Sequence, residues 1–186
     1  MKDTTLQGCT EQQLFSTYSA EHQAQLTSDR EACFLGTAPT LGAVAQAFGE
    51  ATARLWVSMH LHDLASFAGG SKITPQQIAA TAEVIVAMHS RLKLTELMYF
   101  FLHLKGGEWG AYYGLGNGMQ VTSALSQFLA SRVAIIDSLE RERTARREAA
   151  ERGKRRGVTY DEYLQWRRDN GLGEPDCPWL KEGGAA

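Results

Sequence analysis

Apolar residues recur along most of the chain at the spacing of an α-helix. Two segments show this spacing clearly, an early one with Phe15, Tyr18 and Leu26 and a later one with Ile78, Ala82, Ile85 and Leu92. Residues three to four positions apart share one face of a helix, whereas the strict alternation of a half-buried strand is absent from the sequence. The pattern therefore predicts an all-α fold, which we expect to be a bundle of six to seven helices.

Helix starts are marked by three threonines that are each followed by a long polar side chain three residues later. The pairs are Thr10 with Gln13, Thr74 with Gln77 and Thr159 with Glu162. In such a capping box the hydroxyl and the long side chain satisfy free backbone donors reciprocally. Pro75 also occupies a first helical position, where proline is tolerated. We therefore expect helices to begin at these three places.

Two segments, residues 50–67 and 95–104, are apolar around most of their helical circumference. A helix that is apolar on nearly all sides is normally buried. Both segments are therefore expected in the middle of the bundle.

A long helix is expected to begin near Met119, after a glycine-rich loop. Val121, Leu125, Phe128, Arg132, Ile135 and Leu139 recur at alternating intervals of four and three residues. We call this row of residues the seam of the helix. This spacing places one side of the helix against the body. Beyond Leu139 the sequence is mainly alanine and charged residues, so the helix is predicted to project past the core.

Four regions follow from these patterns. Residues 1–140 are expected to form a helical core domain, and residues 141–157 a basic extension of the long helix. Residues 158–171 are predicted to form a short helix. Residues 172–186 are rich in proline, glycine and charge, which favours a flexible tail.

Charge is distributed unevenly, although the net charge of the whole chain is −2. Residues 1–140 carry eight Lys and Arg against twelve Asp and Glu, residues 141–156 carry eight against three, and residues 157–186 carry three against six. A basic helix on an acidic protein suits a polyphosphate, because phosphate neutralisation releases counterions. The residues expected to bind nucleic acid or a partner here are Arg141, Arg143, Arg146, Arg147, Arg152, Lys154, Arg155 and Arg156.

The same segment has a second interpretation. Acidic residues precede arginines by four positions in the pairs Glu142 with Arg146, Glu148 with Arg152 and Glu151 with Arg155. Such pairs are typical of a solvated helix that supports itself. Nucleic-acid contact and a merely solvated helix therefore both remain open.

The glycine-rich loop at residues 105–118 does not have the lysine of a phosphate-binding loop or the glycine spacing of a dinucleotide site. Lys105, Trp109, Tyr112 and Tyr113 suit a surface for base stacking or for a protein partner. The aromatic residues suit packing at the end of the bundle equally well, and Glu108 within the loop favours packing.

The sequence contains no complete catalytic constellation. His60 and His62 lie two residues apart, which on a helix directs them to different sides, and a metal phosphohydrolase of the His-Asp type is only a minor alternative. Cys33 has no neighbouring histidine and is expected to be structural. We therefore expect no catalytic residues, no metal and no cofactor.

Three widely spaced cysteines fit a reducing compartment. The amino terminus lacks the apolar core of a signal peptide, and no apolar run approaches the length of a membrane span. We therefore expect a cytoplasmic protein with no membrane partner.

A pattern of residues around the loop is shared with other proteins, at Thr95, Glu96, Leu97, Met98, Phe100, Phe101, Lys105, Gly107, Trp109, Gly110, Tyr113, Gly114, Phe128 and Arg132. In these residues the chain resembles uncharacterised small helical proteins of phages and mobile elements of gut bacteria. Where that pattern usually has an acidic residue and a proline, this chain has Asn117 and Gly118. Similar loops occur in phage replication accessory proteins, including some that resemble helicase loaders.

The resemblance implies a non-enzymatic accessory protein of phage or mobile-element DNA replication, which contacts nucleic acid or a replication protein through its basic helix. The alternative is a structural or interaction module with no nucleic-acid role, which docks a partner helix or self-associates through the long helix.

Overall fold

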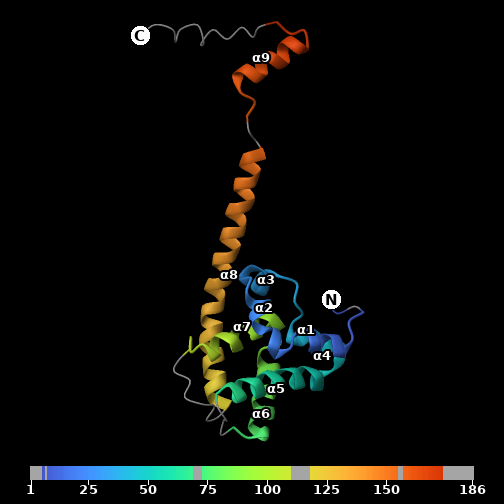
Figure 1. Ribbon diagram of the computed structural model, residues 1–186, viewed down its shortest axis with the longest axis vertical. Coiled ribbons are helices and arrows are strands. Elements are labelled where there is room, and N and C mark those ends of the chain that lie inside the picture. The colour runs from blue at the N-terminus through green and yellow to red at the C-terminus, as the bar shows by residue number, and fades with distance from the viewer. Residues whose placement is uncertain (1–5, 7, 69–72, 110–117, 155–156, 174–186) are drawn as a thin grey trace. The chain divides into compact units, whose positions relative to one another are not determined.

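A computed structural model describes residue 6 and residues 8–68, 73–109, 118–154 and 157–173. These residues form nine α-helices and one 3-10 helix without a β-strand, which confirms the predicted all-α fold (Figure 1). The helices are α1 (Glu11–Thr17), η2 (Ala20–His22), α2 (Gln23–Thr27), α3 (Arg30–Leu35), α4 (Leu41–Phe48), α5 (Glu50–Phe67), α6 (Pro75–Met88), α7 (Leu94–Lys105), α8 (Gly118–Lys154) and α9 (Tyr160–Asp169). The chain divides into two units, Met1–Arg141 and Glu142–Ala186.

All three predicted capping boxes are present, at the starts of α1, α6 and α9. In the first, the Gln13 backbone N–H donates to the Thr10 hydroxyl over 3.2 Å, and the Thr10 N–H donates to the Gln13 side chain over 2.8 Å. Pro75 occupies the start of α6 as predicted. These local signals therefore fix three helix starts correctly.

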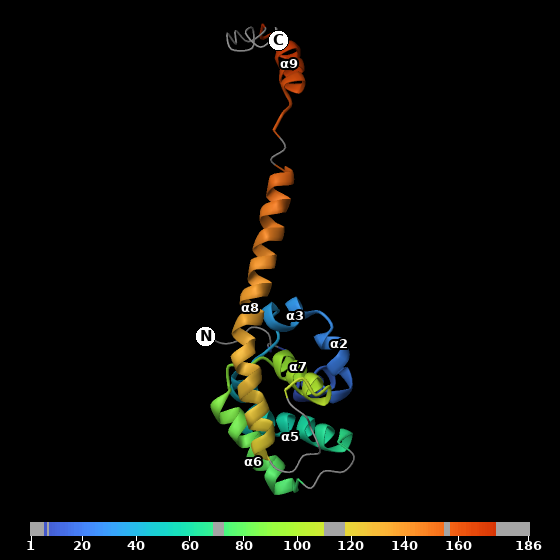
Figure 2. The same ribbon diagram turned by 90° about the vertical axis from the view of Figure 1, so that its left-hand side faces the viewer.

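The core is built around α7, as its apolar sequence predicts. Nine of its twelve residues are buried, and α2, α3 and α5 all contact it (Figure 2). Phe34 of α3 and Phe128 of α8 lie against Tyr99 and Phe100 of α7, with ring centroids 5.1 to 6.4 Å apart. Aromatic rings thus join three helices in the centre of the first unit.

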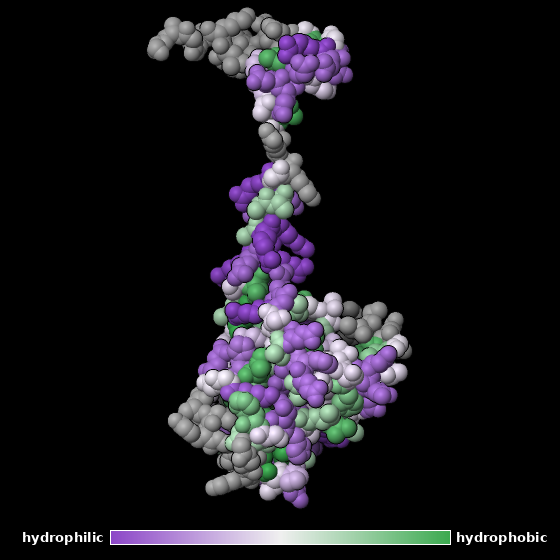
Figure 3. All heavy atoms as spheres, viewed as in Figure 1, coloured by the Kyte–Doolittle hydropathy of each residue, from purple (hydrophilic) through white to green (hydrophobic). Residues whose placement is uncertain are grey.

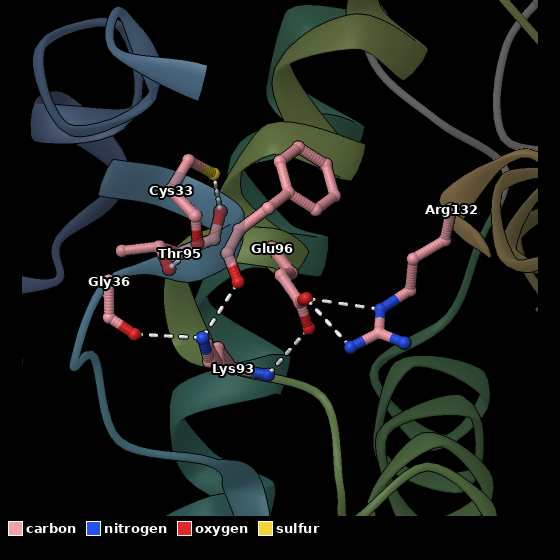
Figure 4. Close-up of polar contacts among 7 residues, drawn as sticks. Cys33, Gly36, Lys93, Thr95, Glu96 and Arg132 are labelled. Atoms are coloured by element: carbon pink, nitrogen blue, oxygen red, sulfur yellow. Dashed lines mark hydrogen bonds and ion pairs between the residues drawn. The ribbon is translucent and has the colours of Figure 1, made fainter. Parts of the chain in front are cut away.

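The predicted seam of α8 is confirmed. Val121, Leu125 and Phe128 are completely buried, and Leu139 is nearly so. Arg132 lies in the same seam and forms an ion pair with the buried Glu96 of α7 (Figure 4). The amino-terminal part of α8 is therefore an integral part of the first unit.

The prediction that residues 50–67 lie in the middle of the bundle is wrong for one side of α5. Leu55 and Met59 are 54% and 45% exposed, although Trp56, Val57 and Leu61 beside them are buried. Among the described residues, α4, α6 and α7 pack on α5, and Leu55 and Met59 lie outside the buried part of its surface. Apolar composition alone did not distinguish a covered face from an uncovered one.

The early apolar segment is divided among α1, η2 and α2, and α3 is a further short helix, which explains why the helices outnumber the six to seven expected. The backbone carbonyl of Tyr18 accepts hydrogen bonds from Trp56 Nε1 at 2.9 Å and from His60 Nε2 at 3.1 Å. Two side chains of α5 thus donate hydrogen bonds to the backbone carbonyl at the end of α1. The periodic spacing of Phe15, Tyr18 and Leu26 does not reflect one continuous helix.

Candidate nucleic-acid interface

The basic segment, residues 141–156, lies mainly on the carboxy-terminal part of α8. Arg141, Arg143, Arg146, Arg147 and Arg152 are all exposed on this helix. The surface of this part of α8 is mostly hydrophilic (Figure 3). Lys154 is the last residue of α8, whereas Arg155 and Arg156 lie outside the described residues.

Helical register gathers part of this charge on one side. Each residue advances about 100° around an α-helix, so Arg146 and Arg147 lie within about 60° of Arg143. We call the side formed by Arg143, Arg146 and Arg147 the basic face.

The three acidic residues of the segment fall outside the basic face. By the same rotation, Glu142, Glu148 and Glu151 lie about 80° or more away from Arg143. The basic face therefore presents several cations and no carboxylate within an arc of about 100°. The separation is local, because Glu142 lies only about 40° from Arg146 and Glu151 only about 40° from Arg147.

The segment also makes polar contacts typical of a solvated helix, one of them from Arg146 of the basic face. Arg152 forms an ion pair with Glu148 over 3.4 Å, in which both side chains are mostly exposed. Arg146 Nε donates to the backbone carbonyl of Glu142, also over 3.4 Å. Exposed pairs of this kind contribute little to stability. The predicted pair of Glu148 with Arg152 is thus present.

Lys105 and Trp109, which the sequence offered as binding residues, make contacts within the first unit. Lys105 forms an ion pair with Asp63 and donates to the Gln23 side chain over 2.9 Å. The Trp109 ring packs on Phe128, with centroids 5.4 Å apart, which supports the packing interpretation. Tyr112 and Tyr113 lie outside the described residues.

His60 is buried in the same network and is held neutral. Its Nδ1 accepts from the Gln23 side-chain amide at 2.8 Å, and its Nε2 donates to the Tyr18 carbonyl. Burial lowers the pKa of His60 to about 4. Since both ring nitrogens are engaged, His60 is not positioned to bind a metal. His62 is exposed on another side of α5, as the two-residue spacing predicted.

The described part of the chain has neither a metal-binding cluster nor a reactive thiol at Cys33. It contains no group of three or more His, Cys, Asp or Glu residues arranged to hold a metal ion. Cys33 is buried and donates to the Thr95 carbonyl, and burial raises its pKa to about 12. This thiol therefore has the structural role that its sequence context predicted.

A surface pocket of about 500 Å³ lies beside the end of α7 and is lined by Phe67, Leu102, His103, Lys105, Gly106 and Glu108. Glu108 pairs with His103 Nδ1. The His103 ring also stacks on the Tyr99 ring, with centroids 3.8 Å apart. The cations that line the pocket are thus matched by carboxylates.

Sequence reasoning did not identify the aromatic side of α9. Tyr160 and Trp166 are 47% and 53% exposed there, and Tyr163 lies beside them. The signal was present in the segment "YDEYLQWRRD", in which positions 160, 163 and 166 recur at helical spacing. It was missed because the segment was read only as a short helix.

No solved structure and no curated protein matches the chain. Among protein families, residues 73–171 match one described as a family of unknown function, DUF6633. The match includes α6, α7, α8 and α9, and so contains the complete basic segment.

Among the described residues, no helix is long and apolar enough to cross a membrane.

Proposed function

The chain belongs to the DUF6633 family, and we propose that it is a non-enzymatic nucleic-acid-binding protein whose basic segment contacts phosphates. The observation that carries this proposal is the basic face of α8, on which cations gather while the three acidic residues lie elsewhere. Arginine suits this task because its planar guanidinium binds phosphate in a bidentate manner.

The dimensions of the basic face suit a backbone contact. Arg143 and Arg147 are four residues apart, which corresponds to about 6 Å along a helix. One strand of duplex DNA carries a phosphate about every 3.4 Å, so the face is long enough to contact two neighbouring phosphates. Such contacts supply affinity and orientation without reading sequence.

We further propose that the role of this binding is accessory to phage or mobile-element DNA replication. Support comes from the resemblance of the loop at residues 105–118 to loops of phage replication accessory proteins. A replication protein is the corresponding partner class. The first unit would then serve as the body that presents the basic segment.

A second candidate, an interaction module that self-associates or docks a partner helix, is favoured by an apolar surface on α5 and α6. Arg54 and Glu83 pair across these helices over 3.9 Å. Each helix also carries exposed apolar residues shortly after its member of this pair. The exposed residues there are Leu55, Met59, Val84 and Met88.

Equilibrium binding of the full chain to labelled DNA, followed by fluorescence anisotropy, tests the leading proposal. The informative variant is Arg143→Gln with Arg147→Gln, and the matched control is Arg30→Gln with Arg91→Gln, which changes the net charge equally. We expect weaker binding for the first variant only. Equal affinity of both variants and the wild type would refute the proposal, and loss of dimers in Leu55→Ser would favour the second candidate.

A further inference from the structure

We propose that α9 stacks on unpaired bases, so that the chain prefers single-stranded nucleic acid to duplex. This inference rests on the proposed function and adds the substrate class. It is carried by the aromatic side of α9, defined here as Tyr160, Tyr163, Leu164, Trp166 and Arg167, and called the aromatic face.

The aromatic face has the components of a stacking surface. The rings of Tyr163 and Trp166 are nearly parallel, with an interplanar angle of 18° and centroids 6.4 Å apart. Arg167 lies over the Tyr163 ring at 5.6 Å and donates to its hydroxyl over 2.9 Å. Aromatic rings and arginine are the side chains on which bases stack in proteins that bind single strands.

The aromatic face itself carries no carboxylate. At about 100° per residue, Asp161 and Asp169 lie about 60° beyond the nearest residues of the face, and Glu162 lies about 40° from Trp166. Two of these carboxylates are already engaged, Glu162 in the capping box and Asp169 with the Gln165 side chain. The only charged residue of the aromatic face is therefore Arg167, which is positive.

Among the described residues, no residue of α9 is buried, although the helix contains two tyrosines, a leucine and a tryptophan. It belongs to the same unit as residues 142–154 of the basic segment. A single strand presents both phosphates and free base faces to such a unit, whereas the bases of a duplex are already stacked on one another.

Trp166→Ala in the full chain tests this inference, with an unstructured oligothymidine and a duplex of equal length as probes. Loss of one stacking contact predicts about 5- to 150-fold weaker binding to the single strand, the equivalent of ~1 to 3 kcal/mol. Duplex affinity should remain unchanged. Trp166→Phe keeps an aromatic ring and should retain most of the single-strand affinity, and Leu164→Ala is the control for a non-aromatic change on the same face.

The outcomes separate this inference from the proposed function. Base stacking is refuted if Trp166→Ala keeps wild-type affinity for both probes, or loses affinity for both equally. Phosphate contact is then still tested separately by the variant with Arg143→Gln and Arg147→Gln. Loss of self-association in Trp166→Ala, with unchanged DNA binding, would assign the face to a protein contact and refute stacking. A wild-type chain that binds neither probe would refute both proposals.

Discussion

The Arg132 guanidinium of α8 holds the completely buried carboxylate of Glu96 on α7. Nη2 and Nε of Arg132 lie 2.8 and 3.1 Å from the same carboxylate oxygen, and the other oxygen accepts the Lys93 backbone N–H. The Lys93 ammonium in turn donates to the carbonyls of Phe34 and Gly36 (Figure 4). One polar cluster therefore fastens α8 and the end of α3 to the start of α7.

Replacing Arg132 with Met should destabilise the first unit, because it leaves the Glu96 charge buried without its partner. Breaking a buried ion pair in this way costs about 3 to 5 kcal/mol, and the partial exposure of Arg132 places the expected loss near the lower end. Urea unfolding measures it. Arg132→Lys keeps the charge but not the paired geometry and should lose less, whereas an Arg132→Met variant as stable as wild type would show that the pair is dispensable.

Stability should decrease as the pH falls from about 6.5 to about 4, because His60 remains neutral in the folded chain. Its pKa is lowered from 6.5 to about 4 by burial, so below pH 6.5 the unfolded chain binds a proton that the folded chain does not. Between pH 7.5 and 5.0 this lowers the free energy of unfolding by about 2 kcal/mol. His60→Gln should lose that part of the dependence, and parallel pH profiles for the two proteins would contradict the assignment.

Gly118→Ala should destabilise the junction of α8 with α6. A Cβ at this position would overlap the Thr81 hydroxyl and lie 3.3 Å from Thr81 Cβ. That hydroxyl cannot rotate away freely, since it donates to the Gln77 carbonyl over 2.7 Å. Overpacking of this kind costs about 1 to 3 kcal/mol. Thermal unfolding should show recovery when Thr81→Ala is added, with Thr81→Ala alone as the control, and no recovery would place the strain elsewhere.

Local signals allowed much of the fold to be predicted. Capping boxes act within four residues, and the α8 seam is a periodic pattern, so both were visible in the sequence. Contacts between distant residues were not. The sequence placed Arg132 in an apolar seam, but nothing local indicates that its partner is Glu96, 36 residues earlier. Likewise, the end of α1 depends on Trp56 and His60, which no pattern near Tyr18 reveals.

The candidate interface was predictable to a similar extent. The charge count located the basic segment, but its two unlike sides became apparent only with a continuous helix from Gly118 to Lys154. The sequence could not decide between stacking and packing for Trp109, because that depends on Phe100 and Phe128 of the assembled core. The sequence likewise could not show that Trp166 is exposed, because exposure depends on the packing of α9 and not on its local pattern.

The salt dependence of single-strand binding tests the central claim most directly. The logarithm of the association constant falls with the logarithm of salt concentration by about 0.7 for each phosphate contacted on a single strand. If Arg143 and Arg147 each contact a phosphate, Arg143→Gln with Arg147→Gln should make this slope less steep by about 1.4. The Arg30 and Arg91 control should keep the wild-type slope. An unchanged slope for the Arg143 and Arg147 variant would contradict nucleic-acid binding by the basic face.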